Sequence, residues 1–410
     1  MKKTVIVVGA GAAGLIAARK LSEKKYSVII LEAGKESGGR IQTHAPAGNE
    51  GVVEGGAEFI HGRLPLTLAL CNEGNIKYIP AEGKMYRRIN NKWKEETEMT
   101  EGWEKLIKKM GSLKEDMTLN TFLEEYYGGD NYTELKKHVL SFVEGFDLAD
   151  PEKVSVRSLY EEWSKEQEEN FRIPGGYNKL IHFIENECLK SGCVMIKEDA
   201  VTQIVWQKGE VTAYTASGKK YSGEKILVTV PVSLLTGVAG IEFIPAMEDR
   251  SKAAADIGFG PVIKVALHFT KRFWKKDTRF IFSEEMIPTW WTQLPLKNNL
   301  LTGWAGGPKA SKMNRHSDEE LLEIALVSLS NIFSLGTASL RSNLDQWYVF
   351  NWKEGAYSYA TPQSKAAKKL LNTPLENTVF FAGEGLYEGD YPGTVEAALA
   401  SGKQTAGLMM

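Results

Sequence analysis

The chain has 410 residues, a hydrophobic content of 43% and a formal net charge of −2 at pH 7. This length and composition suggest two or three domains with a sizeable core, and the balanced charge argues against a nucleic-acid partner, which normally meets a basic surface. No apolar run reaches the roughly 18 residues that a membrane-spanning helix needs, so we expect no membrane association.

The chain contains three cysteines, Cys71, Cys188 and Cys193. Their spacing is unlike that of a metal site, and a small, odd number of cysteines fits a reducing compartment. We therefore expect a cytoplasmic location and no bound metal.

The first residues, "MKKTVIVVGAGAAGLIAARK", imitate a signal peptide in their lysines, apolar run and small side chains. A different pattern lies inside them: a short strand from Val5 to Val8, then Gly9, Gly11 and Gly14 in the spacing G-x-G-x-x-G, then a helix. In such a turn the first glycine makes the bend, the second lets the backbone approach a pyrophosphate, and the third lets the helix pack on the strand. The N-terminus of the helix adds N–H groups for the phosphates.

The second strand, "YSVIILE", ends at Glu32, 23 residues after Gly9. A carboxylate at that distance can accept hydrogen bonds from both hydroxyls of an adenosine ribose, and with the flanking strands it makes the glycine pattern a strong dinucleotide signal. In the next stretch, "AGKESGGRIQT", Gly38 and Gly39 let the chain pass close to a diphosphate, and Arg40 supplies a fixed cation for it.

The stretch "AGKESGGRIQT" resembles the second fingerprint of FAD-containing oxidoreductases of the amine oxidase superfamily, and "VEGGAEFIHG" (residues 53–62) is similar to that family's next motif. In the family, a Gly-Gly turn at this motif brings the backbone against the isoalloxazine ring. The resemblance therefore implies FAD as the cofactor. Its implied contacts in the first sixty residues are Gly9, Gly11, Ala13, Gly14, Glu32, Ala33, Gly39, Arg40, Gly55, Gly56, Ala57 and Glu58.

Residues 65–170 read as a helical stretch with few motifs that resemble those of the family. The segments "TLNTFLEEYY" and "NYTELKKHVLSFVEGF" have helical spacing, and we interpret their apolar stripes as core. We assign no functional role to His138 or Glu144. The segment "FRIPGGYNKLI" (171–181) matches the family landmark where the chain re-enters the FAD domain, and the hairpin series after it places Val201 where the family contacts the adenine.

In the segment "FGPVIKVALHF" (residues 259–269), the residues from Val262 to Phe269 read as a strand that contains a lysine. Because side chains alternate along a strand, the odd-numbered residues from 263 to 269 share an apolar face, and Lys264 shares the other face with His268. That second face could be solvated, since lysine is rarely buried without a partner, or it could be turned toward a flavin. In amine oxidases a lysine on this strand reaches toward flavin N5 through a water, so the resemblance favours a flavin role for Lys264.

The stretch "HSDEELLEIALVSLSNIF" reads as a helix with a capping box of Ser317 and Glu320. The next segment, "NWKEGAYSYATP" (351–362), is similar to the family's Trp-x-x-Gly-x-Tyr segment, which implies that Trp352 packs near the flavin and that Tyr357 stands across its substrate face. Monoamine oxidases attach FAD through a cysteine just before that tyrosine. Ala356 occupies this position here, so we expect non-covalent FAD.

The segment "NTVFFAGEGLYEGDYPGTVEAALASG" (377–402) reads as a strand, a glycine turn, a loop and a helix, and is similar to the family's closing FAD motif. The resemblance implies that Glu384, after Gly383, hydrogen-bonds the ribityl chain. It also implies that the backbone of Thr394 and Val395 faces the pyrimidine end of the flavin. Monoamine oxidases carry tyrosines on both walls of the substrate cage, whereas Thr394 takes the wall opposite Tyr357 here, as in polyamine-oxidase-like and histone-demethylase-like relatives.

The implied catalytic residues are therefore Lys264, Tyr357, Thr394 and His61, the last of which matches a histidine near the active site of polyamine oxidases. Glu58 could attract an ammonium group, or it could be a structural acid beside the flavin. A runner-up is an L-amino-acid oxidase, in which Arg63 would clamp the substrate carboxylate. A flavoprotein of the desaturase or isomerase type is a further alternative.

The predicted fold is a doubly wound, Rossmann-like α/β FAD-binding domain interleaved with an α+β substrate domain that contains a mixed sheet. We assign residues 1–70, 172–240 and 350–410 to the first domain, and residues 71–171 and 241–349 to the second. No second G-x-G-x-x-G lies on a strand–helix turn, so no NADPH site is expected. The expected reaction is FAD-dependent oxidation of a small amine to an imine, with oxygen reduced to hydrogen peroxide.

Overall fold

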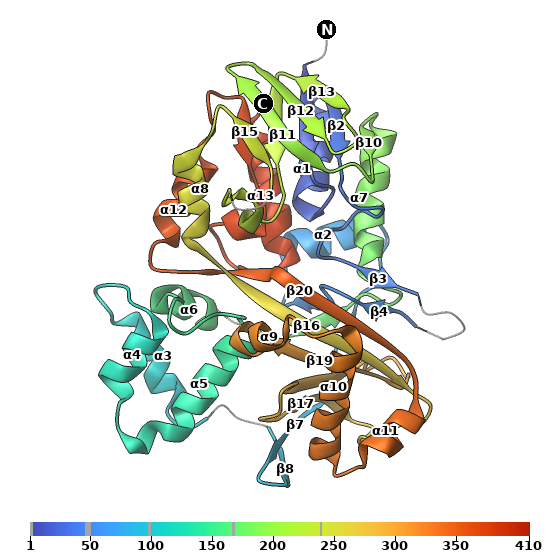
Figure 1. The fold of residues 1–410 in the computed structure, drawn as a ribbon, viewed down its shortest axis with the longest axis vertical. Helices are drawn as coiled ribbons and strands as arrows, with labels where there is room; N and C mark the ends of the chain where they lie inside the picture. The colour runs from blue at the N-terminus through green and yellow to red at the C-terminus, as the bar shows by residue number, and fades with distance from the viewer. Residues whose placement is uncertain (1–2, 46–50, 97–99, 166–168, 238–239) are drawn as a thin grey trace.

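The structure is a computed structural model that describes residues 3–45, 51–96, 100–165, 169–237 and 240–410. An upper part is built around a parallel sheet, and below it a mixed sheet and a layer of helices lie side by side (Figure 1). Two long strands, β16 (Ile257–Phe269) and β20 (Leu344–Ala360), run between the two parts (Figure 1). Segments from the beginning, middle and end of the chain build the upper part, so the chain passes between the parts several times.

Five parallel strands form the central sheet of the upper part, in the order β10-β2-β1-β14-β21. Most of their side chains are buried and apolar, as expected for a parallel sheet that is covered on both faces. The strands are β10 (Val194–Ile196), β2 (Ser27–Leu31), β1 (Thr4–Val8), β14 (Lys225–Val228) and β21 (Val379–Phe381). Because the strands are parallel, the turns that follow β1, β2 and β21 open at the same edge of the sheet.

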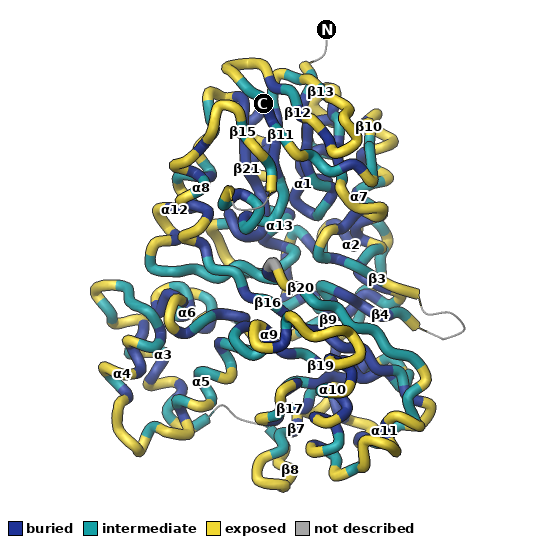
Figure 2. The backbone as a smooth tube through the Cα atoms, viewed as in Figure 1, coloured by how far each residue is buried: buried dark blue, intermediate teal, exposed yellow. Residues whose placement is uncertain are grey.

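Helices cover one face of this sheet, and a smaller sheet with two helices covers the other. The helices of the first face are α1 (Ala12–Glu23), α7 (Asn178–Lys190) and α13 (Val395–Leu408). The second face packs on β13 (Lys220–Gly223), β12 (Glu210–Thr215), β11 (Val201–Gln207), β15 (Glu242–Ile244), α8 (Glu248–Ala255) and α12 (Ser364–Asn372). Figure 2 shows β21 and α1 in the buried centre of this part.

The mixed sheet of the lower part has seven strands in the order β20-β16-β19-β18-β17-β7-β8, with only the β17–β7 pair parallel among these described strands. The odd-numbered residues from 263 to 269 all lie in the core between this sheet and α10, which confirms the predicted apolar face. The capping box of Ser317 and Glu320 is also present. The further elements are β19 (Leu300–Gly306), β18 (Thr289–Thr292), β17 (Thr278–Phe282), β7 (Lys84–Ile89), β8 (Lys92–Glu95), α9 (Gly307–Met313), α10 (Asp318–Phe333) and α11 (Thr337–Asn343).

The helical layer has its own apolar core and contains both helices predicted in this region. Its members are α3 (Trp103–Gly111), α4 (Leu119–Tyr127), α5 (Thr133–Gly145) and α6 (Val156–Trp163). Short elements join the parts: α2 (Pro65–Glu73), β3 (Thr43–His44), β4 (Val53–Glu54), β5 (Ile60–His61), β6 (Ile79–Pro80) and β9 (Asn170–Arg172).

The predicted fold class is confirmed, because a doubly covered parallel sheet is interleaved with a part that contains a mixed sheet. The domain boundaries stay predictions, and those near residues 70, 171 and 350 fall inside α2, β9 and β20. No single helix of the described residues is long and apolar enough to cross a membrane, although α10 and α11, bent by 112°, pass that test as a pair. Within the described ranges, no group of three or more His, Cys, Asp or Glu residues could hold a metal ion.

Candidate active site

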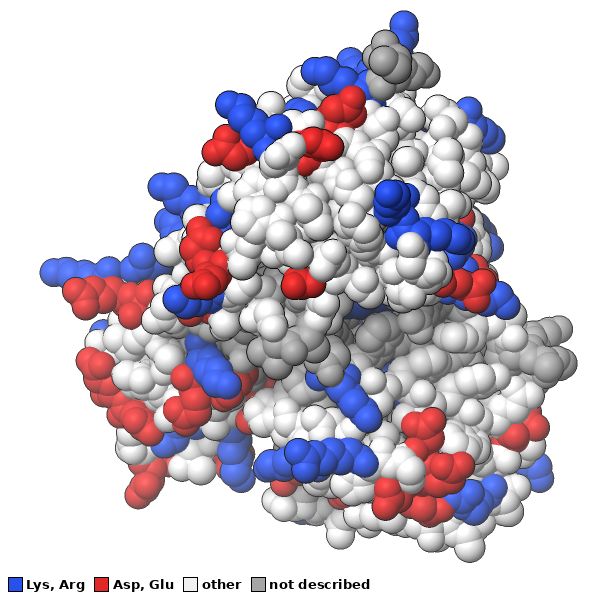
Figure 3. All heavy atoms as spheres, turned by 45° about the horizontal axis from the view of Figure 1, so that its top comes forward, with Lys and Arg blue, Asp and Glu red and all other residues white. Residues whose placement is uncertain are grey.

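A cavity of about 2390 Å³ lies where the upper and lower parts meet. The carboxyl ends of β1 and β2 line it from above, and β16, β17, β20 and the helical layer line it from below. Figure 3 shows a recess between the two parts on one face, with acidic and basic side chains mixed around it. Segments that are far apart in the sequence therefore share one site.

The turn between β1 and α1 presents backbone N–H groups to this cavity. Gly9 has a φ of +102°, which residues with a side chain rarely adopt. Helix α1 begins after Gly11 with no side-chain cap and with no acidic residue in its first turn. A Cβ on Gly14 would lie 2.0 Å from the carbonyl oxygen of Gly9, so the helix packs tightly on the turn. Such an uncapped N-terminus can bind a diphosphate through its free N–H groups and its positive dipole end.

Glu32 lines the cavity beside this turn, and the backbone fixes its carboxylate. Its Oε2 accepts a hydrogen bond from the N–H of Ala10 at 2.7 Å, and its Oε1 accepts one from the N–H of Gly34 at 2.7 Å. A carboxylate oxygen can accept a second hydrogen bond. Glu32 is therefore held in place with acceptor capacity left for ribose hydroxyls.

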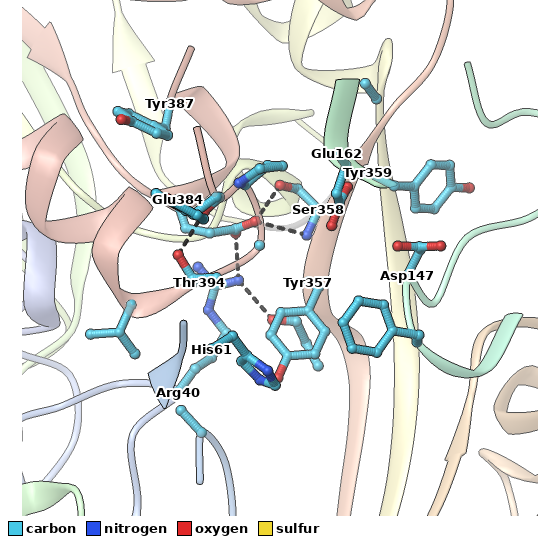
Figure 4. A pocket seen from close by; sticks show the side chains of 18 of the residues that line it. Arg40, His61, Asp147, Glu162, Tyr357, Ser358, Tyr359, Glu384, Tyr387 and Thr394 are labelled. Carbon is cyan, nitrogen blue, oxygen red and sulfur yellow. Dashed lines mark hydrogen bonds and ion pairs between the residues drawn. The ribbon is translucent and has the colours of Figure 1, made fainter. Parts of the chain in front are cut away.

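Arg40 and Glu384 connect three distant segments at the cavity wall (Figure 4). Nη1 of Arg40 donates to Oε2 of Glu384 at 2.9 Å and to the carbonyl of Ala356 at 2.8 Å. The other oxygen of Glu384 accepts hydrogen bonds from the hydroxyl and the N–H of Ser358. A Cβ on Gly56 would lie 1.9 Å from the carbonyl oxygen of Arg40, so only glycine fits where these two segments cross.

Thr394 precedes α13 and serves as its N-cap. Its hydroxyl accepts a hydrogen bond from the N–H of Ala397 at 3.2 Å and donates one to the carbonyl of Tyr391 at 2.6 Å. Thr394 and Val395 both line the cavity. The described bonds of the Thr394 hydroxyl are those of a helix cap, and its predicted catalytic role stays a prediction.

Lys264 is buried in the middle of β16, with 1% of its surface exposed. Its Nζ donates to Oε2 of Glu58 at 2.7 Å and to the carbonyl of Gly56 at 3.1 Å. The same Nζ lies 5.4 Å from the ring centre of Trp291. The interpretation of this strand face as solvated is therefore wrong, because Lys264 lines the cavity and is held by buried acceptors.

Glu58 is the centre of a buried polar network. Its Oε1 accepts hydrogen bonds from Arg172, from Nε1 of Trp291 at 2.9 Å and from Nε2 of Gln293 at 2.9 Å. Burial acts to raise the pKa of Glu58, but the charges of Lys264 and Arg172 and their hydrogen bonds outweigh it and hold the pKa at about 2. Because Glu58 already holds two cations, the structural interpretation of this acid is favoured over attraction of a substrate ammonium.

Aromatic side chains form the wall of the cavity near these charges. The ring centre of Tyr357 lies 6.2 Å from that of Trp304, and burial raises the pKa of Tyr357 to about 12, so its phenol keeps its proton at neutral pH. Burial lowers the pKa of His61 to about 4, so its imidazole is neutral. Figure 4 shows Tyr357 and His61 projecting toward the same part of the cavity.

Comparison with known families agrees with this geometry. The sequence profile of the family described as "Flavin containing amine oxidoreductase" matches residues 12–410, nearly the whole chain. The chain belongs to this family.

Two curated relatives within the flavin amine oxidoreductases illustrate the similarity. The chain is 27% identical to human lysine-specific histone demethylase 2, over 98% of this chain and 53% of the relative. It is 25% identical to polyamine oxidase 4 from Oryza sativa subsp. japonica, over 97% of this chain and 87% of the relative. The chain thus spans about half the length of the human demethylase and of lysine-specific histone demethylase 1B from Mus musculus.

Solved structures of amine oxidases share the fold. Putrescine oxidase bound to putrescine matches with a TM-score of 0.82 and 18% identity, over 99% of this chain and 98% of that one. Cyclohexylamine oxidase from Brevibacterium oxydans IH-35A matches with a TM-score of 0.80 and 19% identity, over 100% of this chain and 99% of that one. At such identities the likeness shows the fold alone.

The residues of this chain fit the FAD of a flavin amine oxidoreductase. The uncapped N-terminus of α1 suits the diphosphate, Glu32 suits the ribose, and the glycine crossing at Gly56 leaves room for a flat ring against the backbone. Of the predicted site residues, those that line the cavity are Gly9, Gly11, Ala13, Glu32, Ala33, Gly39, Arg40, Gly56, Ala57, Glu58, His61, Val201, Lys264, Trp352, Tyr357, Gly383, Glu384, Thr394 and Val395.

Two predicted cofactor residues lie behind the cavity wall. Gly14 packs α1 against the turn, as described above. Gly55 accepts a hydrogen bond from Nε1 of Trp352 at 2.9 Å through its carbonyl, and a Cβ there would lie 2.6 Å from the ring of Phe350. Both glycines therefore support the site through close packing.

The partners of Glu58 were not predicted from the sequence. Trp291 and Gln293 sit two residues apart in "TWWTQLP", so they share a strand face, and Arg172 directly precedes the "IPGG" landmark. These local signals exist, but none of them indicates which acid the three residues surround. Arg63, the predicted carboxylate clamp, is exposed over 71% of its side chain, pairs with Glu169 at 2.7 Å, and is not among the described residues that line the cavity.

Proposed function

We propose that the protein uses bound FAD to oxidise the C–N bond of a small amine to an imine, with oxygen reduced to hydrogen peroxide. The observation that carries this proposal is the buried ammonium of Lys264, which Glu58 and the Gly56 carbonyl hold on the wall of an aromatic cavity. When bound, FAD supplies a two-electron acceptor that takes a hydride equivalent from the carbon next to the nitrogen and passes the electrons to oxygen.

The charges around Lys264 leave a net positive centre beside the cavity. Lys264 and Arg172 carry two positive charges and share one carboxylate, Glu58, so the group sums to +1. Preorganised charge in a partly dry site stabilises opposite charge as it develops in a reaction. This centre can therefore stabilise the negative charge that forms as oxygen accepts electrons.

The aromatic wall orients the amine and favours its free-base form. Tyr357 and Trp304 form an apolar surface, and His61 adds a neutral imidazole to it. Such surroundings disfavour an ammonium ion, and only the free amine has the lone pair that forms the C=N bond as hydride leaves. The nitrogen then releases one proton, and water hydrolyses the imine.

The relatives support an amine substrate without fixing which one. The names of the similar proteins include polyamine oxidase, putrescine oxidase and cyclohexylamine oxidase. The demethylase relatives make a methylated lysine peptide a further candidate, although this chain spans only about half of their length.

An anaerobic reduction assay tests the proposal. The FAD-loaded protein is mixed without oxygen with putrescine, spermidine, cyclohexylamine, 2-phenylethylamine, several amino acids and a dimethyl-lysine peptide, and the flavin absorbance is followed. We expect at least one amine to bleach the flavin, and readmitted oxygen to restore the colour with formation of one peroxide per flavin. A flavin that no amine reduces would contradict amine oxidation, and reoxidation without peroxide would contradict the oxidase assignment.

A further inference from the structure

Arg279 brings a positive charge into the cavity from β17. The register between β17 and β7 shifts between Thr278 and Phe280, so Arg279 stands at an irregularity of the strand. Bulges of this kind re-aim a side chain relative to the regular alternation of a strand. Arg279 lines the cavity and is half-buried there.

The guanidinium of Arg279 has no anionic partner among the described residues. Its Nε is buried and makes no hydrogen bond within the part of the chain that the structure describes, and its Cζ lies 5.0 Å from the centre of the Phe280 ring. Two other arginines that line the cavity are paired with acids, Arg40 with Glu384 and Arg87 with Glu96 at 2.8 Å. A buried N–H group without an acceptor is costly, so a ligand that supplies one is favoured.

We propose that Arg279 binds a carboxylate of the substrate, so that the amine oxidised in this cavity also carries an acidic group. This inference rests on the proposed amine oxidation and names its substrate class. The planar guanidinium presents N–H groups in a fork that matches the two oxygens of a carboxylate. Arg279 thereby takes the role that the sequence suggested for Arg63, which lies outside the cavity.

The charges near Arg279 favour a substrate that carries a carboxylate over one whose charged groups are all positive. Burial and the like charge of Arg172 both lower the pKa of Arg279, and the charge of Arg279 in turn contributes to the lowered pKa of His61. Arg279 is therefore close enough to Arg172 and to His61 to interact electrostatically with each of them. A diamine would bring a second cation toward this positive region, whereas a carboxylate would neutralise it.

Aromatic rings next to Arg279 suit the apolar part of such a substrate. The ring centre of Phe280 lies 5.8 Å from that of Phe59 and 6.1 Å from that of Trp291, and all three rings line the cavity. Lys264 approaches the same Trp291 ring. The aromatic surface thus extends from the buried lysine toward Arg279, so one substrate can contact both.

Carboxylate binding tests the proposal without turnover. Benzoate, which has no amine, is titrated into the FAD-loaded protein, and binding is measured by calorimetry and by the flavin difference spectrum, with benzamide as the uncharged analogue. We expect benzoate to bind the wild type, and to bind Arg279→Met at least tenfold more weakly. Arg279→Lys, which keeps the charge and loses the fork, should fall between them. Arg63→Met is the matched control and should bind benzoate like the wild type.

Paired substrates extend the test to the reaction. L-Phenylalanine is compared with 2-phenylethylamine, and 4-aminobutyrate with butylamine, in anaerobic flavin reduction by the wild type and by Arg279→Met. We expect the variant to lose at least tenfold in the rate for an acid-bearing amine while the rate for its acid-free analogue is kept.

The outcomes separate this inference from the proposed function. Equal benzoate affinities of the wild type and Arg279→Met, in variants with normal FAD content, would overturn the role of Arg279 and leave amine oxidation standing. The same is true if the wild type oxidises acid-free amines and binds no benzoate. If benzoate binding depends on Arg279 but no amine reduces the flavin, the anion site stands and amine oxidation falls.

Discussion

The ammonium of Lys264 is stable in the middle of a buried strand because acceptors surround it. Isolated charges are strongly disfavoured in a protein interior, and a single carboxylate that serves both Lys264 and Arg172 offsets that cost for two cations at once. Trp291 and Gln293 add neutral hydrogen bonds to the same carboxylate. The position of the lysine charge is therefore set by residues from three segments that are distant in sequence from its own strand.

Replacement of Lys264 by methionine should slow oxygen reduction. Lys264→Met keeps most of the volume of the stem and removes the charge, while Arg172 still pairs with Glu58, so we expect a folded, FAD-binding protein. Without the ammonium, flavin reoxidation should slow at least about tenfold, which corresponds to about 1.4 kcal/mol of barrier. Stopped-flow mixing of the reduced variant with oxygenated buffer measures the rate.

Lys190→Met is the matched control for this variant. Lys190 is exposed over 73% of its side chain at the end of α7, where it pairs with Glu187, and its loss should leave reoxidation unchanged. If Lys264→Met reoxidises as fast as this control and is reduced by amine at the wild-type rate, the lysine has no catalytic role.

The neutral His61 should make stability fall at mildly acidic pH. Its pKa is lowered by burial from 6.5 to about 4, so between these values the unfolded chain binds a proton that the folded chain does not. The free energy of unfolding therefore decreases as pH falls from 6.5 to 4, by about 3 kcal/mol in total from this residue. His61→Gln should show a flatter decline in urea unfolding over that range, whereas His182→Gln, exposed on α7, should follow the wild type. Parallel declines of His61→Gln and the wild type would contradict the lowered pKa.

At the scale of residues, the sequence could indicate which side chains line the site, but not which residues these side chains contact. The resemblance singled out Lys264, Tyr357 and His61, which the structure places on one cavity. The hydrogen bond between Lys264 and Glu58 joins positions 206 residues apart, and it depends on how the mixed sheet meets the glycine crossing. The sequence did not indicate that Arg279 faces the cavity, because its orientation follows from an irregular strand register that no local pattern shows.

At the scale of elements, α1 and α13 cross so closely that one of them needs glycine. A Cβ on Gly402 of α13 would lie 2.1 Å from the carbonyl oxygen of Ala13 on α1. A Cβ on Gly407, on the same helix, would meet only Nζ of Lys20, at 3.3 Å, which is the flexible end of a side chain. Because the N-terminus of α1 is the expected diphosphate site, a shift of α1 would disturb FAD binding.

Alanine at these two glycines should therefore have opposite effects. Gly402→Ala should overpack the crossing, lower the free energy of unfolding by about 1–3 kcal/mol and weaken FAD binding. Gly407→Ala should gain up to about 1 kcal/mol, because alanine favours helix over glycine. Urea unfolding of the FAD-free variants and FAD titration measure both. Equal stability and equal FAD affinity of the two variants would show that α1 and α13 can move apart without loss of stability or of FAD binding.

The last third of β20, residues 356–360, lines the cavity that we expect to hold the flavin. Ala356 has no nucleophilic atom, and its carbonyl accepts a hydrogen bond from Arg40. We therefore expect the FAD to be released when the holoprotein is precipitated with acid, with yellow colour in the supernatant. Colour that stays in the washed pellet would indicate a covalent bond to another residue.

Regular elements were predicted more reliably than their ends. The strand of residues 379–381 and the capped helix after Ser317 agree with the structure, because local propensity and capping determine them. Strand β16 begins at Ile257, five residues before the predicted Val262, because pairing with β20 extends it through Gly258 and Gly260. Such an extension depends on a distant strand and is invisible to local patterns.

At the scale of the whole molecule, the cavity wall is shared by parts with separate cores. The parallel sheet has apolar clusters on its two faces, the mixed sheet has another, and the helical layer has its own. Residues from the upper part, the mixed sheet and the helical layer all line the same cavity. A cofactor bound there contacts several of these units, so its binding energy should stabilise the folded chain as a whole.

FAD should therefore raise the melting temperature in a way that depends on Glu32. A ligand at a hundred times its Kd adds about 2.7 kcal/mol to the free energy of unfolding. Glu32→Ala removes the acceptor for the ribose and for the N–H groups of Ala10 and Gly34. If the Kd for FAD becomes a hundredfold weaker, the same FAD concentration adds only about 0.4 kcal/mol to the free energy of unfolding. Glu36→Ala, exposed two residues beyond Gly34, is the matched control and should keep the full shift. FAD is added at increasing concentration to the FAD-free wild type and both variants, and the melting temperature of each is measured. Equal increases of the melting temperature in Glu32→Ala and Glu36→Ala would show that Glu32 does not hold the cofactor.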